Sequence, residues 1–246
     1  MEPLLSFSNL SVAVDKKQIL NNVSFVVESS KVHALMGQNG SGKSSLSYTA
    51  MGHPFYQVKQ GSIFFNGVNI THMSPEKRAQ MGLFLSFQSP YSLTGVSVFS
   101  FLKASYNACV DSTISVENFN NLLKKKMDLL DIDVSFVDRD VNVGFSGGEK
   151  KRLEMLQLLL LQPKVAILDE LDSGLDIDAL KIVAHGLKTI KQHNPDMAII
   201  IITHYQKILE YIQPDFVHIM HQGSLVASAD ASLLPIVQKE GYSAFI

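Results

Sequence analysis

Apolar residues follow two different patterns along this chain, and both patterns indicate β-strands. In residues 23–27, valine and phenylalanine alternate with polar side chains, which is typical of a strand with one solvated face. Residues 32–36, 165–168 and 198–202 are instead almost continuous apolar runs, as in strands with two buried faces. We therefore predict short strands over residues 4–35 and further buried strands in the second half of the chain.

Apolar positions three and four residues apart predict helices elsewhere. One apolar stripe consists of Leu180, Val183, Ala184, Leu187 and Ile190. A second consists of Val116, Phe119, Leu123, Met127 and Leu130, with the lysines at 124–126 expected on the solvated face of that helix. Shorter elements are also expected, namely a hairpin over 61–70 that turns at Asn66-Gly67, a helix over 75–81 that starts at Pro75, and two final strands over 216–220 and 224–228.

The order of these elements predicts the fold class. Buried apolar strands that alternate with helices are typical of an α/β fold, in which helices cover both faces of a mainly parallel sheet. The segment 91–160 differs because its apolar pattern is helical, so we interpret it as a helical subdomain inserted into the α/β part. We expect one domain over 1–246, with residues 1–90 and 161–246 forming the α/β core.

Composition limits the class of protein. The chain has 246 residues, of which 46% are hydrophobic and 18% charged, as in ordinary soluble globular proteins. A formal net charge of −2 provides no basic field for nucleic acid. We find no apolar run near the ~18 residues of a spanning helix and no signal peptide, so we expect a cytoplasmic protein without direct membrane insertion.

The chain has a single cysteine, Cys109, which excludes an internal disulfide. One thiol cannot hold an iron–sulfur cluster by itself, because such clusters usually need about four thiolates. We expect Cys109 to be a small buried apolar residue.

The stretch 37-GQNGSGKS-44 carries the strongest chemical signal. It fits the pattern G-x-x-x-x-G-K-[ST], with a predicted buried strand before it and a predicted helix after it. Glycines let backbone N–H groups surround phosphates, Lys43 adds a positive charge near the β- and γ-phosphates, and the Ser44 hydroxyl can bind Mg²⁺. We expect the nucleotide phosphates to be bound by Gly37, Gln38, Asn39, Gly40, Ser41, Gly42, Lys43, Ser44 and Ser45.

Two acids, Asp169 and Glu170, end the apolar run 165–168. Alone, two acids after a strand are weak evidence of function. Next to a phosphate loop, however, the first acid typically holds the metal shell, and the second can polarise the attacking water.

Two further polar residues also end apolar runs. His204 follows the run 198–202, so a parallel sheet would bring it to the edge that carries the two acids, where it could contact the γ-phosphate. A lone histidine is more often structural, and we interpret the other seven in that way. Gln88 follows the apolar run 83–87 and could reach both Mg²⁺ and the water.

The stretch 144-GFSGGEKKRLEMLQ-157 places glycines directly before a helical run. In a purely structural interpretation, Ser146 caps the helix and Glu149 completes a capping box. The second interpretation is that the glycines also allow a ligand to approach the backbone closely.

Taken in order, the motifs are the phosphate loop, Gln88, Ser146-Gly147-Gly148-Glu149, Val165 to Glu170, Ser173-Gly174-Leu175-Asp176 and His204. This series covers nearly the whole chain and resembles the nucleotide-binding domain of the ABC ATPase superfamily. The resemblance implies a P-loop sheet core with an N-terminal antiparallel β part and a helical subdomain.

The resemblance also implies ATP hydrolysis with ATP and Mg²⁺ as cofactors. Glu170, His204, Gln88 and Lys43 would be catalytic, and Ser44, Gln88 and Asp169 would bind the metal. In this superfamily the Ser-Gly-Gly tip caps ATP on the partner subunit of a head-to-tail dimer. The tip residues Ser146, Gly147, Gly148 and Glu149 would therefore contact ATP across that dimer, and a capping role for Ser146 is compatible with this. Asp176 would also bind the nucleotide.

The residues in several motifs are similar to those of the SufC family, the ATPases of the Suf iron–sulfur cluster assembly machinery. Glu149 and two lysines stand where transporter ATPases usually carry Gln and then Arg-Gln, and 83-LFLSFQSP-90, 211-YIQPDFVHIMHQGSLV-226 and 240-EGYSAF-245 add to the likeness. This narrower resemblance implies SufB- and SufD-like scaffold partners. The alternative is the ATPase subunit of an ABC membrane transporter, which shares all the ATP chemistry.

Some positions depart from these families. Leu171 stands where SufC proteins usually have Thr, and the loop 13–17 lacks the aromatic residue that many ABC domains stack on adenine. We also consider a resting-state lock, in which Lys150, Lys151 or Arg152 pairs with a carboxylate such as Glu170.

Overall fold

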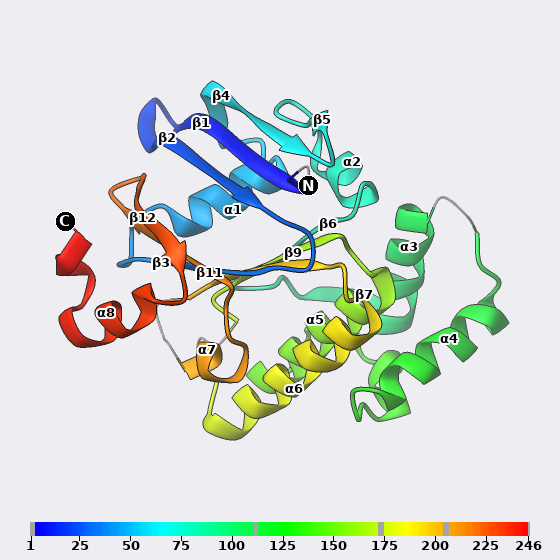
Figure 1. Ribbon diagram of the computed structural model, residues 1–246. Helices are drawn as coiled ribbons and strands as arrows, with labels where there is room; N and C mark the ends of the chain where they lie inside the picture. Colours follow the sequence, from blue (N-terminus) through cyan, green and yellow to red (C-terminus); the bar gives the residue numbers. More distant parts are fainter. Residues whose placement is uncertain (1–2, 111–112, 172–174, 204–206, 246) are drawn as a thin grey trace.

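The computed structural model describes residues 3–110, 113–171, 175–203 and 207–245. Figure 1 shows an antiparallel sheet above a central sheet, with most of the helices below the central sheet. This arrangement confirms the predicted α/β fold with a mainly parallel core and an N-terminal antiparallel part.

The N-terminal part is a four-stranded antiparallel sheet with the order β2-β1-β4-β5. Its strands are β1 (Leu5–Val14), β2 (Lys17–Val27), β4 (Gln57–Phe65) and β5 (Val68–Asn69). The first two strands are 10 and 11 residues long rather than short. Irregular pairing interrupts them near Asn9 and Asn22, which both adopt positive φ, and such β-bulges break the regular alternation of inward and outward side chains.

The central sheet has the order β12-β11-β3-β10-β9-β6, and only the pair β11–β12 is antiparallel. Residues of β9 alternate between two hydrophobic clusters, since Val165 and Ile167 pack on one face and Ala166 and Leu168 on the other. The strands are β3 (Val32–Met36), β6 (Leu83–Ser86), β9 (Val165–Asp169), β10 (Ala198–Ile202), β11 (Phe216–His221) and β12 (Ser224–Asp230).

Helices cover both faces of this sheet. On the side of the antiparallel sheet lie α1 (Lys43–Met51) and, beside it, α2 (Pro75–Gln80). On the other side, α5 (Gly147–Leu161) packs against α6 (Ile177–His193). The remaining helices are α3 (Val98–Val110), α4 (Val116–Asp128), α7 (Lys207–Tyr211) and α8 (Leu233–Glu240), with 3₁₀ turns η1 (Val134–Asp138) and η2 (Tyr242–Phe245).

Val116 belongs to the predicted helix but is 63% exposed, because it is the first residue of α4, directly after the Ser115 cap and beyond the packed stripe. The prediction that Cys109 is buried is wrong. Cys109 is only half-buried near the end of α3, where burial still raises the pKa of its thiol. The segment 91–160 contains α3, α4 and most of α5 together with a short two-stranded sheet of β7 (Leu93–Ser97) and β8 (Asp140–Val141).

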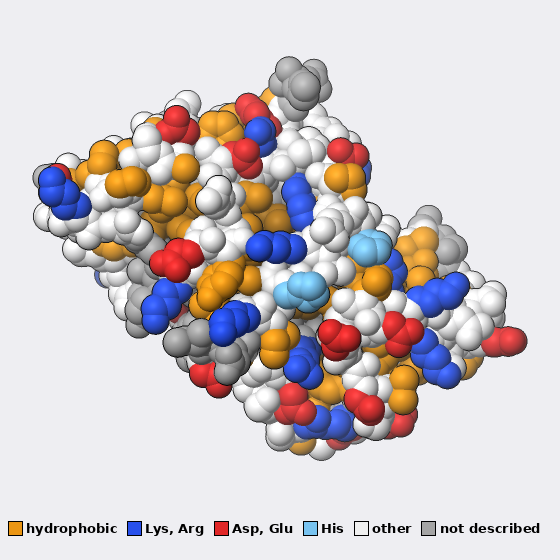
Figure 2. All heavy atoms as spheres, turned by 60° about the horizontal axis from the view of Figure 1, so that its bottom comes forward, with side chains coloured by type: hydrophobic (Ala, Val, Ile, Leu, Met, Phe, Trp, Pro, Cys, Tyr) orange, Lys and Arg blue, Asp and Glu red, His pale blue; other side chains and the backbone are white. Residues whose placement is uncertain are grey.

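The lower face of the molecule carries mixed charge. Figure 2 shows Lys and Arg side chains interleaved with Asp and Glu side chains and with apolar patches on this face. A surface of this kind has no extended field of one sign.

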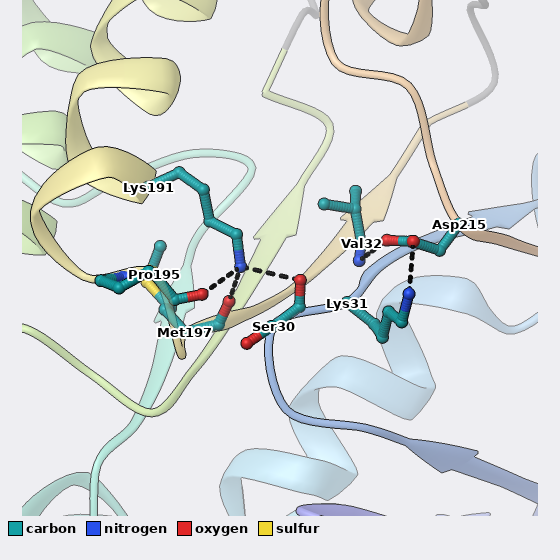
Figure 3. A network of polar contacts seen from close by, with 7 residues as sticks. All are labelled: Ser30, Lys31, Val32, Lys191, Pro195, Met197 and Asp215. Atoms are coloured by element: carbon teal, nitrogen blue, oxygen red, sulfur yellow. Dashed lines mark hydrogen bonds and ion pairs between the residues drawn. The ribbon is translucent and has the colours of Figure 1, made fainter.

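A polar network joins segments at the amino-terminal edge of the central sheet (Figure 3). The Lys191 ammonium, from the last turn of α6, donates to the carbonyls of Ser30 (2.9 Å), Pro195 (3.0 Å) and Met197. Next to it, one Asp215 carboxylate oxygen pairs with Lys31 at 2.9 Å, and the other accepts the Val32 amide at 2.8 Å.

Two histidines form a buried pair inside the sheet. His33 Nδ1 of β3 lies 2.9 Å from His218 Nε2 of β11, and His218 Nδ1 lies 2.8 Å from the Ser228 hydroxyl. Burial lowers the pKa of His33 to about 4 and that of His218 to about 3, so both rings are neutral at pH 7. His33 Nε2 is buried without a hydrogen-bond partner among the described residues. This nitrogen is therefore best assigned as the unprotonated one, and His33 Nδ1 donates to His218.

Candidate functional site

The predicted site residues lie at the carboxyl edge of the parallel strands. Residue pairing aligns Ile202 with both Leu35 and Asp169, and Leu168 with Ser86. The chain segments that follow β3, β6, β9 and β10 therefore leave the sheet at one edge. The phosphate loop, Gln88 and Glu170 are in these segments, and Asp169 is the last residue of β9.

The phosphate loop depends on glycine at specific places. Gly37 has φ +150°, and a Cβ atom there would lie 2.3 Å from the Met220 carbonyl oxygen. Gly42 has φ +106° and forms the amino-terminal cap of α1. The loop borders a cavity of about 320 Å³, lined by Ile19, Asn39, Gly40, Gly42, Lys43, Ser44, Ser45, Gln88 and Glu170.

Lys43 crosses the phosphate loop with its side chain. It is 5% exposed, and its ammonium donates to the carbonyl oxygens of Gly37 at 2.8 Å and Gln38 at 3.1 Å. Burial lowers the pKa of Lys43, while the nearby charges of Glu170 and Asp169 raise it. A positive charge is thus held in the loop by weak neutral acceptors, which phosphate oxygens can replace with stronger charge-assisted bonds.

Asp169 is buried beneath the start of α1. Its two carboxylate oxygens accept hydrogen bonds from Ser44 at 3.2 Å and from Ser47 at 3.3 Å. Burial raises the pKa of Asp169, and the Ser44 bond opposes that rise. Carboxylate, hydroxyl and amide oxygens are the ligands that Mg²⁺ prefers, so Ser44, Asp169 and Gln88 fit this ion.

Glu170 is held in an unusual backbone conformation directly after β9. Its φ is +48°, a region that non-glycine residues rarely adopt, and its amide donates to the Ile202 carbonyl at 2.9 Å. The Gln88 side-chain amide donates to a Glu170 carboxylate oxygen. The structure thus brings together two predicted residues that are far apart in sequence, and both line the cavity.

His204, Ser173 and Gly174 lie outside the described residues. The preceding residue, Thr203, is fully buried, and its amide donates to the Leu35 carbonyl at 3.3 Å. The parallel pairing of β10 with β9, on which the prediction for His204 depended, is present.

The tip before α5 is a complete capping box. The Ser146 hydroxyl accepts the Glu149 amide at 3.2 Å, and the Glu149 carboxylate accepts the Ser146 amide at 2.8 Å. Arg139 pairs with the same carboxylate, and this bond is the largest influence that lowers the pKa of Glu149 to about 2. Asp176 similarly caps α6 by accepting the Ala179 amide at 2.7 Å. Gly147 and Gly148 are the first residues of α5.

The tip and Asp176 contribute nothing to the lining of the phosphate-loop cavity among the described residues. Within one chain, therefore, the phosphate loop and the Ser146 tip are two separate surfaces. The structural interpretation of Ser146 is confirmed, and the capping bonds leave its exposed hydroxyl and the backbone of Gly147 accessible.

Two features of the site were missed in the sequence. Ile19 of β2 lines the cavity, whereas the expected position of a base contact was the loop 13–17. A buried cluster also joins α5 to β6, since Glu154 accepts from Lys151 at 3.0 Å and from the Ser86 hydroxyl at 2.7 Å. The sequence offered only one signal, an acid three residues after a lysine in an apolar helix.

This cluster bears on the predicted resting-state lock. The Lys151 side chain is 7% exposed, and its ammonium pairs with the Glu154 carboxylate rather than with that of Glu170. Lys151 is therefore committed to the interior of α5.

Comparison with known proteins identifies the family. A model of the ABC transporter family matches residues 20–173, which is more than half of the chain. The probable ATP-dependent transporter slr0075 of Synechocystis is 44% identical over 245 residues, covering 98% of this chain and 95% of the relative. The probable ABC transporter ATP-binding protein SpyM3_0208 of Streptococcus pyogenes is 47% identical over 242 residues, covering 98% and 94%.

Solved structures have the same fold. An ATP-binding cassette of an ABC transporter, MJ1267, has a TM-score of 0.80 at 22% identity and covers all of both chains. The cassette MJ0796, a dimer in a post-hydrolysis state with ADP and Pi, has a TM-score of 0.79 at 14% identity, covering 92% of this chain and 98% of that one.

The chain belongs to the ABC transporter ATP-binding family and is an ATPase of that class. None of the helices in the described part of the chain is long and apolar enough to cross a membrane.

Proposed function

We propose that this chain is a SufC-type ATPase, which couples ATP binding, dimerisation and hydrolysis to iron–sulfur cluster assembly on SufB- and SufD-like scaffolds. The amino-acid sequence of the helix that follows Ser146 is the observation that carries the proposal. Glu149 stands there in place of the transporter Gln, where it completes the cap and pairs with Arg139. Lys151 likewise has a specific use in the buried pair with Glu154. The chain has one half-buried cysteine, so cluster ligands would come from the partners.

In this proposal the ATP chemistry is divided among residues at one sheet edge. Lys43 and the loop amides bind the phosphates, and Ser44, Asp169 and Gln88 hold Mg²⁺. The bound ion neutralises charge on the phosphate oxygens. Glu170 accepts a proton from the attacking water, which Gln88 helps to orient, and His204 contacts the γ-phosphate.

Two copies of the chain would complete each site in a head-to-tail dimer. In the tip of Ser146, Gly147, Gly148 and Glu149, Ser146 and Gly147 are exposed, and the backbone N–H groups of Gly147 and Gly148 at the start of α5 favour an anion such as the γ-phosphate. Asp176 contributes from the start of α6. An isolated chain would then hydrolyse ATP slowly, because its own tip is absent from its own cavity.

A groove beyond Gln88 is the best candidate for the scaffold contact. Its volume is about 240 Å³, and it is lined mainly by apolar side chains, with Tyr91 80% exposed and Phe87 38% exposed at its rim. Ser86 and Glu154 also line it. The buried cluster that ties β6 to α5 thus forms part of this surface, so a docked partner would touch both the Gln88 segment and the helix behind the Ser146 tip.

The second candidate is the ATPase subunit of a membrane transporter. The names of the relatives in Synechocystis and Streptococcus, which describe probable transporter proteins, favour it. It would use the same ATP site and the same groove, with a membrane protein as the occupant.

Affinity capture separates these candidates. The tagged chain is recovered from soluble lysate and, in parallel, from detergent-solubilised membranes, and co-purifying proteins are identified by mass spectrometry. Tyr91→Asp places a charge in the groove, and Val116→Asp places the same charge on an exposed position of α4 as a matched control. Both variants are first checked for an unchanged melting temperature.

SufB- and SufD-like proteins should be captured from the soluble fraction by the wild-type chain and by Val116→Asp, and should be lost with Tyr91→Asp. Capture of a multi-span membrane protein instead would overturn the assignment to cluster assembly and leave the ATPase intact.

A further inference from the structure

A cavity of about 400 Å³ lies between α5, α6 and the turn that follows α4. This volume is within the range of about 300–1,000 Å³ that is usual for small-molecule sites. Figure 1 shows α5 and α6 side by side below the central sheet. Among the described residues, none that lines this cavity also lines the phosphate-loop cavity or the groove beyond Gln88. It is therefore a separate site on the molecule.

The inner wall of this cavity is apolar. Leu130, Met155 and Val183 line it and are all buried members of the larger hydrophobic cluster, while Ile182 is 42% exposed at its rim. Gly186 also lines it, and a Cβ atom there would lie 3.2 Å from the Met155 Cγ, so the close packing of α6 on α5 accounts for this glycine. The wall offers apolar surface from which a bound apolar group would displace water.

The turn after α4, which forms the third wall, is held in place by its own backbone. The amides of Leu130 and Ile132 both donate to the Met127 carbonyl, at 3.0 and 3.1 Å. Asp131 lies between them with φ +50° and is exposed. This wall is therefore formed before any ligand binds.

Arg152 distinguishes this cavity from an ordinary apolar hollow. It lies three residues before Met155, on the same face of α5, and is partly buried. Its guanidinium makes no hydrogen bond or ion pair with any residue that the structure describes. Lys181 and His185 of α6 line the same cavity and are exposed. Two permanent cations, Arg152 and Lys181, are thus set against one lining carboxylate, that of Asp131.

We propose that this cavity binds a small amphipathic anion, namely a carboxylate with an apolar body. The two oxygens of a carboxylate match the planar fork of the Arg152 guanidinium, and Lys181 adds a second positive charge. The apolar body would contact Leu130, Met155 and Val183. Water solvates an ordinary surface arginine well enough, but an arginine beside an apolar cavity gains most from an anion that also displaces the water from the cavity.

The cavity joins two helices that begin at functional motifs. α5 begins directly after Ser146, and α6 begins at the Asp176 cap. A bound anion would contact Arg152 of α5 and Lys181 of α6 at once, and would tie together the helices that carry the proposed dimer contacts. The binding site itself does not rest on the proposed function, because it is tested without nucleotide and without a partner.

Sodium octanoate is a suitable probe, because it combines a carboxylate with a short apolar chain. It is titrated into the ¹⁵N-labelled chain, and amide chemical shifts are followed by NMR. Signals from residues 152–155 and 181–186 should move, with a dissociation constant of roughly 1 mM. Octylamine has the same apolar body with the opposite charge, and acetate has the carboxylate without the body, so each should bind at least about tenfold more weakly. The proposal is overturned if these signals do not move, or if octylamine binds as well as octanoate.

Two variants test the residues that carry the proposal. Arg152→Gln should weaken octanoate binding by about tenfold or more, whereas Lys125→Gln, which removes a positive charge from an exposed position of α4, should bind like the wild type. Ile182→Glu places a carboxylate at the exposed rim and should weaken binding as well, with Val116→Glu on α4 as its matched control. Each variant is first checked for an unchanged melting temperature. Wild-type octanoate affinity in either Arg152→Gln or Ile182→Glu would overturn the assignment of this site.

Discussion

The buried pair of His33 and His218 predicts that the protein loses stability in mild acid. Both pKa values are depressed from 6.5, to about 4 and about 3, mainly by burial; the Asp215 charge raises that of His33, and the Lys31 charge lowers it. Above pH 6.5 both rings are neutral in the folded and the unfolded chain, and their contribution is fully present. Below pH 6.5 only the unfolded chain takes up protons, so stability falls until the pH reaches the folded pKa values.

The size of the effect follows from the same values. Between pH 7.5 and pH 5 each histidine lowers the free energy of unfolding by roughly 2 kcal/mol, since most of this loss falls in the 1.5 pH units below 6.5 and one pH unit corresponds to about 1.36 kcal/mol. The pair together gives about 4 kcal/mol. This is a large part of the ~5–15 kcal/mol by which folded domains are usually stable.

Urea unfolding at pH 7.5 and pH 5.0, followed by circular dichroism, measures this loss. The double variant His33→Gln/His218→Gln removes both titrating rings and should reduce the difference between the two pH values by about 4 kcal/mol, whatever its stability at pH 7.5. His72→Gln removes an exposed histidine and leaves the pair intact, so it should keep the wild-type difference. If the double variant keeps the wild-type difference as well, the pair is not the origin of the acid sensitivity and the reasoning fails.

Three further outcomes are expected. Glu170→Gln should still bind ATP and stall as a closed dimer, with phosphate release slowed by about 10²-fold or more; hydrolysis at the wild-type rate would exclude Glu170 as the base. The Arg78 side chain is 2% exposed and donates hydrogen bonds to the carbonyls of Thr49, Ala50, Thr71 and Met73. Arg78→Met should therefore lower the free energy of unfolding by about 3 kcal/mol in urea titrations. A loss below about 1 kcal/mol would contradict this. Ser30 has φ +67°, so Ser30→Gly should stabilise the chain by about 1 kcal/mol, and a lower melting temperature would refute the strain.

Local patterns predicted the parts of the site that depend on one segment. The phosphate loop, the strand before Asp169 and the capping box of Ser146 and Glu149 all follow from residue types at fixed short spacings, and the structure has each of them. Burial was less predictable at the ends of helices. Val116 and Cys109 match an apolar position in type but lie where the helix passes beyond the core.

The meeting of Gln88 with Glu170 followed from the expectation that parallel strands end at one edge, but other contacts between distant segments could not be predicted, because they depend on the order of strands in the sheet. His33 meets His218 because β3 and β11 are neighbours, and Ser86 meets Glu154 because β6 is at the sheet edge that α5 covers. Ile19 reaches the phosphate loop from the antiparallel sheet. A single sequence gives no spacing rule for such pairs.

The Lys191 network gives α6 one fixed end. This helix starts at the Asp176 cap, near the catalytic edge, and finishes where Lys191 binds carbonyls from the turn before β3 and the turn before β10. With 17 residues and about 1.5 Å per residue, it spans about 25 Å. Because the far end is fastened to the sheet, a displacement of Asp176 would turn α6 about Lys191 rather than slide it along its axis. Side chains midway along α6 would then move by about half the displacement of Asp176.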